Sequence, residues 1–135
     1  MKIIFKSLVK QPNVEDTHVN IEVQANCETF VDDKLNEWKI FTFKESENDI
    51  AVRFEISTNK LRIYRDKASL IFELGVKNHN STIDTSSKTF IPITTLLKSI
   101  DFEKNRANYE LYIQNKESNS EVLISECFVE LEIKK

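Results

Sequence analysis

The chain has 135 residues, the size of one ordinary domain, and is long enough to bury a hydrophobic core without disulfides or metals. Apolar residues make up 40% and charged residues 30%, which argues against an intrinsically disordered chain. The net charge of −3 argues against nucleic acid and anionic lipid as partners, because both attract a basic face.

Apolar and polar residues alternate along most of the chain, and this period of two is typical of β-strands with one buried face. In the first half the expected strands span residues 2–9, 17–27, 28–31 and 38–43. Gln11-Pro12-Asn13 closes the first strand, because proline cannot donate to a strand ladder. Asp32-Asp33-Lys34 is predicted as a turn, and residues 45–48 as a polar loop.

The second half continues the pattern, with expected strands at 50–57, 61–65, 68–76, 81–85, 89–97, 107–113 and 122–133. Thr58-Asn59-Lys60 predicts a hairpin turn between the first two, and residues 77–80 predict a further turn. Residues 96–100 have the i, i+4 spacing of a short helical turn. Val122 and Ile124 are out of step with Cys127 and the residues that follow, which indicates a β-bulge.

Many antiparallel strands joined by short turns predict an all-β sandwich or barrel. The sequential hairpins favour a single antiparallel up-and-down β-barrel of about 8–10 strands that covers residues 1–135. Such a barrel can just hold a small ligand inside. The apolar faces expected to line its interior are Val19/Ile21/Val23, Ile50/Val52/Phe54 and Leu70/Phe72/Leu74.

The sequence contains no residue pattern typical of a catalytic or metal site. Glu45 and Glu47 lie close together, but in a predicted polar loop, and His18 and His79 each stand alone. With Gly75 as its one glycine, the chain has no Gly-rich loop to hold a phosphate. We therefore expect no enzyme activity, no metal and no cofactor.

Two cysteines, Cys27 and Cys127, lie far apart in the sequence. They are expected to be buried, reduced thiols, and the alternative is a disulfide between strands that meet when the barrel closes. The apolar run that starts the chain breaks after three residues, shorter than the roughly 7–15 of a signal peptide. We expect a cytoplasmic protein with neither a membrane nor a nucleic acid as its partner.

Three segments of the second half resemble one protein family. They are Leu61–Leu74 (LRIYRDKASLIFEL), Ile83–Thr94 (IDTSSKTFIPIT) and Ala107–Ile113 (ANYELYI). In these segments the chain resembles the YwiB-like bacterial proteins, a domain of unknown function with a calycin-like, lipocalin-like β-barrel. The resemblance covers about residues 61–133. The residues that match the family's pattern are Arg65, Thr85, Thr94 and Tyr109.

The chain also departs from the pattern of this family. Lys67 and Lys88 stand where the family often has glycine, and Ile83 stands where it often has tyrosine. The resemblance implies a fold and no established activity. Because fold does not imply function, the activity stays open.

Two functions fit these observations. The first is a barrel that binds a small apolar or amphipathic molecule inside, with Arg65, Thr85, Thr94 and Tyr109 as ligand-binding residues near its mouth or floor. Structural interpretations are also open: Arg65 would pair with a carboxylate or close the barrel end, and the threonines would be ordinary strand residues. The alternative is a non-enzymatic structural or protein-interaction module with a filled core. An interior cavity of at least ~300 Å³ would favour the first.

Overall fold

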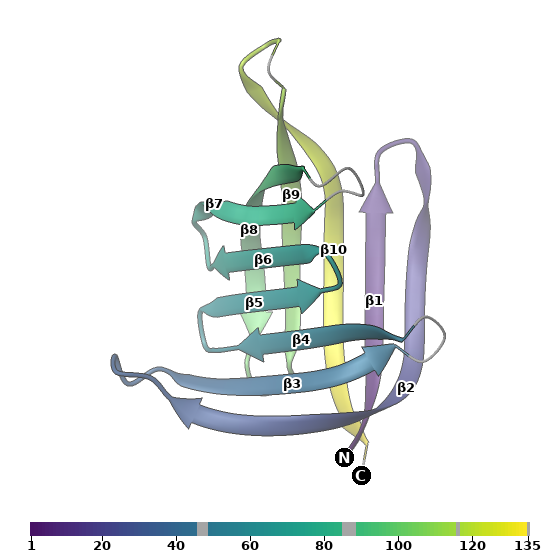
Figure 1. The fold of residues 1–135 in the computed structure, drawn as a ribbon, viewed down its shortest axis with the longest axis vertical. Coiled ribbons are helices and arrows are strands. Elements are labelled where there is room, and N and C mark those ends of the chain that lie inside the picture. Colours follow the sequence, from purple (N-terminus) through teal and green to yellow (C-terminus); the bar gives the residue numbers. More distant parts are fainter. Residues whose placement is uncertain (46–48, 85–88, 116, 135) are drawn as a thin grey trace.

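Ten antiparallel strands form a closed barrel in the computed structural model, which describes residues 1–45, 49–84, 89–115 and 117–134 (Figure 1). The strands are β1 (Lys2–Gln11), β2 (Val14–Val31), β3 (Glu37–Glu45), β4 (Ile50–Ile56), β5 (Lys60–Arg65), β6 (Ala68–Glu73), β7 (Lys77–Asp84), β8 (Phe90–Asp101), β9 (Arg106–Asn115) and β10 (Ser120–Lys134). Each strand pairs with the next, and β10 pairs with β1. The predicted all-β, up-and-down barrel is confirmed.

The barrel is built from two groups of strands that run in different directions. In Figure 1, β3 to β7 run across the view, and β8, β9, β10 and β1 run up and down behind them. Strand β2 joins both groups, because its residues up to Gln24 pair with β1 and those from Ala25 pair with β3. The two strands predicted at 17–27 and 28–31 are therefore one bent strand, and that prediction was wrong.

Other local predictions were wrong as well. Residues 77–80, predicted as a turn, belong to strand β7, whose register against β8 shifts between Asn78 and Ser81. Residues 96–100, predicted as a helical turn, lie in β8, where the register against β9 shifts between Leu97 and Ser99. A bulge changes which residues point inward, so it produces apolar spacing that resembles a helix. The predicted bulge in β10 is confirmed between Leu123 and Ser125.

Large side chains pack together inside the barrel. Three aromatic pairs meet there, with ring centroids 5.4 Å apart for Phe5 and Phe43, 6.4 Å for Phe41 and Phe54, and 4.5 Å for Phe72 and Tyr109. Of the predicted inward residues, Val23, Val52, Phe54, Leu70 and Phe72 are buried. Leu74 is instead 41% exposed, because β6 ends one residue before it, and the strand predicted at 68–76 was too long.

Both cysteines are free in this structure, Cys127 buried and Cys27 half-buried. Burial raises the pKa of each thiol. Among the residues that the structure describes, none belongs to a helix long and apolar enough to cross a membrane. Most of the loop predicted at 45–48 lies outside the described residues.

Candidate functional site

Arg65 and Tyr109, two of the predicted ligand residues, lie on the inner face of the barrel. Arg65 ends β5 directly opposite the buried Val52, and opposite residues share a face. Its Nε and Nη2 donate to Oε1 and Oε2 of Glu45 at 2.7 and 2.9 Å. Burial raises the pKa of Tyr109 well above its usual value, and the nearby Arg65 charge opposes this in part. The structure thus places Arg65 and Tyr109 on the same face of the barrel, with Arg65 already bonded to a carboxylate.

The two threonines predicted as ligand residues do not lie beside Arg65 and Tyr109 in the part of the chain that the structure describes. Thr94 follows the buried Ile93 on β8 and so points to the outer face, where it lies opposite Tyr112 of β9. Its hydroxyl is hydrogen-bonded to Nδ1 of His79 at 3.0 Å. Thr85 lies outside the described residues. The predicted ligand residues therefore do not form one site, as far as the structure describes them.

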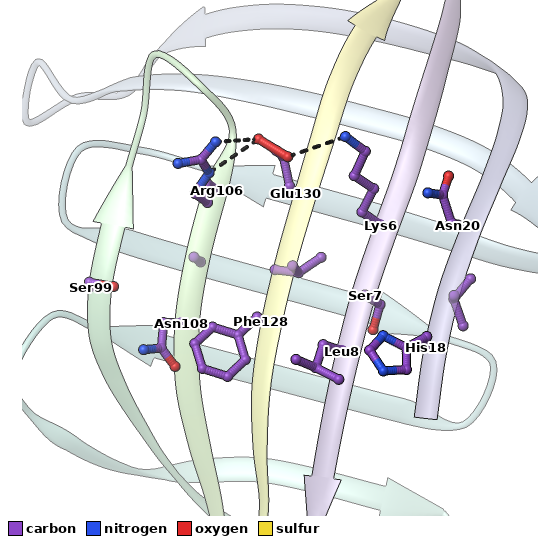
Figure 2. Close-up of a pocket in the computed structure, with 13 residues that line it drawn as sticks. Lys6, Ser7, Leu8, His18, Asn20, Ser99, Arg106, Asn108, Phe128 and Glu130 are labelled. Carbon is purple, nitrogen blue, oxygen red and sulfur yellow. Dashed lines mark hydrogen bonds and ion pairs between the residues drawn. The ribbon is translucent and has the colours of Figure 1, made fainter. Parts of the chain in front are cut away.

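A groove lies on the outer face of the barrel, over the strands β2, β1, β10, β9 and β8 (Figure 2). Its volume is about 530 Å³. Leu8 of β1 and Phe128 of β10 lie directly opposite each other in it, and both are half-buried. His18 lies opposite Leu8 on β2, and Asn108 lies opposite Phe128 on β9. We call this hollow the outer groove: it has an apolar floor with a polar side chain, His18 or Asn108, at each end.

A second row of side chains, two residues further along each strand, carries charges. The row contains Asn20, Lys6, Glu130 and Arg106, in order across β2, β1, β10 and β9. Arg106 donates from Nε and Nη2 to Oε1 of Glu130 at 3.1 and 2.7 Å, and Lys6 Nζ lies 3.8 Å from Oε2 of Glu130 (Figure 2). Lys6 Nζ also lies 2.8 Å from Glu132. Each cation of this row is therefore already paired.

These contacts favour the charged forms of Lys6, Arg106 and Glu132. The hydrogen bond to Glu132 raises the pKa of Lys6, and the hydrogen bond to Glu130 raises that of Arg106. The hydrogen bond from Lys6 lowers the pKa of Glu132. Residues two apart on a strand lie about 7 Å from each other, so the charged row borders the apolar floor closely.

A second, more polar hollow of about 1040 Å³ lies over the outer face of β2 to β5. Tyr64 lines it, the aromatic residue that lies between two arginines in the sequence. One of these arginines, Arg62, is paired with Glu55, and the other, Arg65, is paired with Glu45. Arginines bound in this way offer little to a nucleic acid, and the absence of a nucleic-acid partner stays a prediction. Among the described residues, no group of three His, Cys, Asp or Glu side chains could hold a metal ion.

The sequence reasoning missed the outer groove because it treated outward strand positions as solvated. A signal was present in Phe128, a large apolar residue between Cys127 and Val129, where alternation predicts a polar one. Leu8 is a second such residue, next to Val9. The long distance between β1 and β10 in the sequence hides the fact that these two side chains lie opposite each other.

The fold and the groove define this chain as a closed ten-stranded antiparallel barrel with a candidate binding site on its outer face. The crystal structure of the ywiB protein from Bacillus subtilis is similar to it, with a TM-score of 0.56, 12% sequence identity, and coverage of 99% of this chain and 91% of that one. At this identity the similarity concerns the fold alone. No family model and no curated protein matches the sequence. The YwiB-like barrel is thus confirmed as a fold, and the calycin-like classification stays a prediction.

Proposed function

We propose that this barrel is a non-enzymatic binding protein with a filled core, which holds a small amphipathic molecule in the outer groove over Leu8 and Phe128. The packed interior supports this location. Phe72 and Tyr109 come from β6 and β9, which are not neighbours in the sheet, and their rings meet inside the barrel. The Glu45 carboxylate occupies Arg65, the cation expected to meet an interior ligand. A cytoplasmic location without nucleic acid or membrane as partner belongs to the same proposal.

The observation that carries the proposal is the combination of size and lining in the outer groove. Its volume of about 530 Å³ lies within the range of ~300–1,000 Å³ that small-molecule sites occupy. The apolar floor of Leu8 and Phe128 supplies hydrophobic contact, and a bound molecule would remove the exposed part of both side chains from water. His18 and Asn108 supply hydrogen-bonding groups that would orient the molecule.

Native mass spectrometry of the protein purified from its own host tests this function. We expect a small molecule to co-purify with the wild-type protein and to be lost from Phe128→Ala. Phe90→Ala is the matched control, because Phe90 is 67% exposed and does not line the outer groove. Fluorescence of Trp38, the one tryptophan of the chain, shows that each variant is folded. A molecule that remains bound to folded Phe128→Ala would contradict the proposal.

A further inference from the structure

We propose that the molecule bound in the outer groove is uncharged: a flat apolar ring system with a neutral hydrogen-bonding group, and not a carboxylate, a phosphate or an amine. This inference rests on the proposed function and goes from the site to the chemical class of its ligand. The arrangement of the charged row beside the apolar floor carries it.

The charged row is balanced within itself. Glu130 lies between Lys6 and Arg106 and contacts both, and Lys6 also contacts Glu132. Asp101 lies opposite Arg106 on its other side, in β8. A ligand anion beside the charged row would have to displace a carboxylate from one of these cations or lie unpaired near Glu130. Lys10, the cation at the other side of the floor, contacts the face of the Phe128 ring and does not line the outer groove. A ligand cation over the floor would lie about 7 Å from Lys6, Glu130 and Arg106 alike, inside the Debye length of about 8 Å at physiological salt, so attraction to Glu130 would be offset by repulsion from its two partners.

The remaining polar lining of the outer groove suits a neutral partner. His18, Ser99 and Asn108 offer an imidazole, a hydroxyl and an amide, all of which pair with O–H or N–H groups. The Oδ1 atom of Asn108 is buried and has no hydrogen-bond partner among the described residues. Rotation of this amide toward the groove would let Oδ1 accept a hydrogen bond from a ligand hydroxyl. This bond would remove the desolvation penalty of a buried oxygen that has no partner.

The floor of the outer groove sets the size and shape of the apolar part of the ligand. Leu8 and Phe128 are directly opposite on neighbouring strands, so the floor is two strands wide, about 10 Å. The Nζ atom of Lys10 lies 5.8 Å from the centroid of the Phe128 ring and covers part of that ring. A fused two-ring system matches the width of this floor and can stack on the part of Phe128 that remains open.

Three naphthalene compounds that differ in their head group test the inference: 2-naphthylmethanol, 2-naphthoate and 2-naphthylmethylammonium. Each is titrated at pH 7 into ¹⁵N-labelled full-length protein, and the backbone amide shifts of residues 6–8 and 128–130 report binding in the outer groove. We expect 2-naphthylmethanol to bind there with a Kd roughly three- to tenfold lower than that of either ion, the range for one unfavourable charge contact at this distance.

The variant Glu130→Gln should make the outer groove more favourable for an anion. It removes the carboxylate that occupies Arg106 and Lys6, so the affinity for 2-naphthoate should rise severalfold, while the Kd of 2-naphthylmethanol stays within about twofold. Glu117→Gln removes the same charge from an exposed position outside the outer groove and should change neither value.

The outcomes separate the two proposals. Binding of 2-naphthoate or of the ammonium compound at the groove amides as tightly as the alcohol would overturn the uncharged-ligand inference and leave the outer groove as a binding site. An unchanged 2-naphthoate affinity in Glu130→Gln would also overturn the inference. If none of the three compounds shifted the groove amides at millimolar concentration, the proposed function itself would fail.

Discussion

Arg65 and Glu45 form a two-point ion pair on the inner face of the barrel, which ties the end of β5 to the end of β3 across the intervening strand β4. Both donors of the pair come from one planar guanidinium and both acceptors from one carboxylate. The side chain of Arg65 is about half exposed, so water weakens the pair. Of the two structural interpretations of Arg65, the contacts match pairing with a carboxylate.

Arg65→Lys keeps the charge but loses the fork geometry of the guanidinium. We expect the melting temperature of the ligand-free protein to fall by roughly 2–4 °C, which corresponds to a partly exposed pair worth up to about 1 kcal/mol. Glu45→Gln should give a similar decrease, and the double variant should lose less than the sum of the two. An unchanged melting curve for Arg65→Lys would count against a structural role and favour a ligand-binding one.

Phe72→Ala tests the packing of the barrel interior. Phe72 is 1% exposed, and its ring centroid lies 4.5 Å from that of Tyr109. Removal of the ring should lower the free energy of unfolding by about 3–5 kcal/mol, measured by urea denaturation. The control Phe90→Ala, at an exposed position, should change it by less than about 0.5 kcal/mol. A loss below about 1 kcal/mol for Phe72→Ala would be incompatible with a filled core.

Asp32 should make the stability of the barrel depend on pH in the acid range. Its carboxylate accepts hydrogen bonds from Trp38 Nε1, from Asn36 N and from Lys34 N, and these lower the pKa of Asp32 to about 2. The hydrogen bonds stabilise the ionised carboxylate in the folded state, so this contribution to stability is fully present above about pH 5 and is lost as the pH falls toward 2.

Urea denaturation followed by Trp38 fluorescence at several pH values measures this effect. The stability difference between wild type and Asp32→Asn should be constant above about pH 5 and should shrink as the pH is lowered toward 2. Asp33→Asn, the neighbouring position, is the control. A difference that persists unchanged at pH 2 would show that these hydrogen bonds do not depend on the charge of Asp32.

Where β6 and β7 separate, the buried hydroxyls of Ser81 and Thr95 form hydrogen bonds with the backbone of β6 in place of a neighbouring strand. These strands pair directly only at Ala68–Ile83 and Ser69–Thr82. Further along, Ile71 N donates to Oγ of Ser81 at 2.8 Å, and Ile71 O accepts from Oγ1 of Thr95.

Ser81→Ala leaves the Ile71 N–H without this partner and should cost about 1–3 kcal/mol of unfolding free energy. The backbone amide of Ile71 should also exchange faster with solvent deuterium. Ser118→Ala, at an exposed hydroxyl of the β9–β10 turn, should have little effect. Equal exchange of Ile71 in wild type and Ser81→Ala would show that the hydroxyl does not protect this amide.

The strands and their inner faces could be predicted wherever the alternation is strict, as in Val52 and Phe54 or Leu70 and Phe72. A local pattern does not record where a strand bends or bulges, and this explains the errors in β2, at residues 77–80 and at residues 96–100. The outer groove depends on the register between strands that are distant in sequence. Leu8 and Phe128 meet only because β10 pairs with β1 in one particular register, which no local pattern specifies.

The pairing of β1 with β10 has a consequence for the order in which the barrel folds. It runs from Lys2 opposite Lys134 to Lys10 opposite Glu126, so β1 has only β2 beside it until the tenth strand has been synthesised. Contacts that close so long a loop form late and slow the folding of β proteins. Because Leu8 and Phe128 belong to these two strands, the outer groove comes into existence with this closing step. A ligand held there would bind only completed barrels, and would stabilise them against reopening by a free energy that rises with the logarithm of its concentration once this exceeds the Kd.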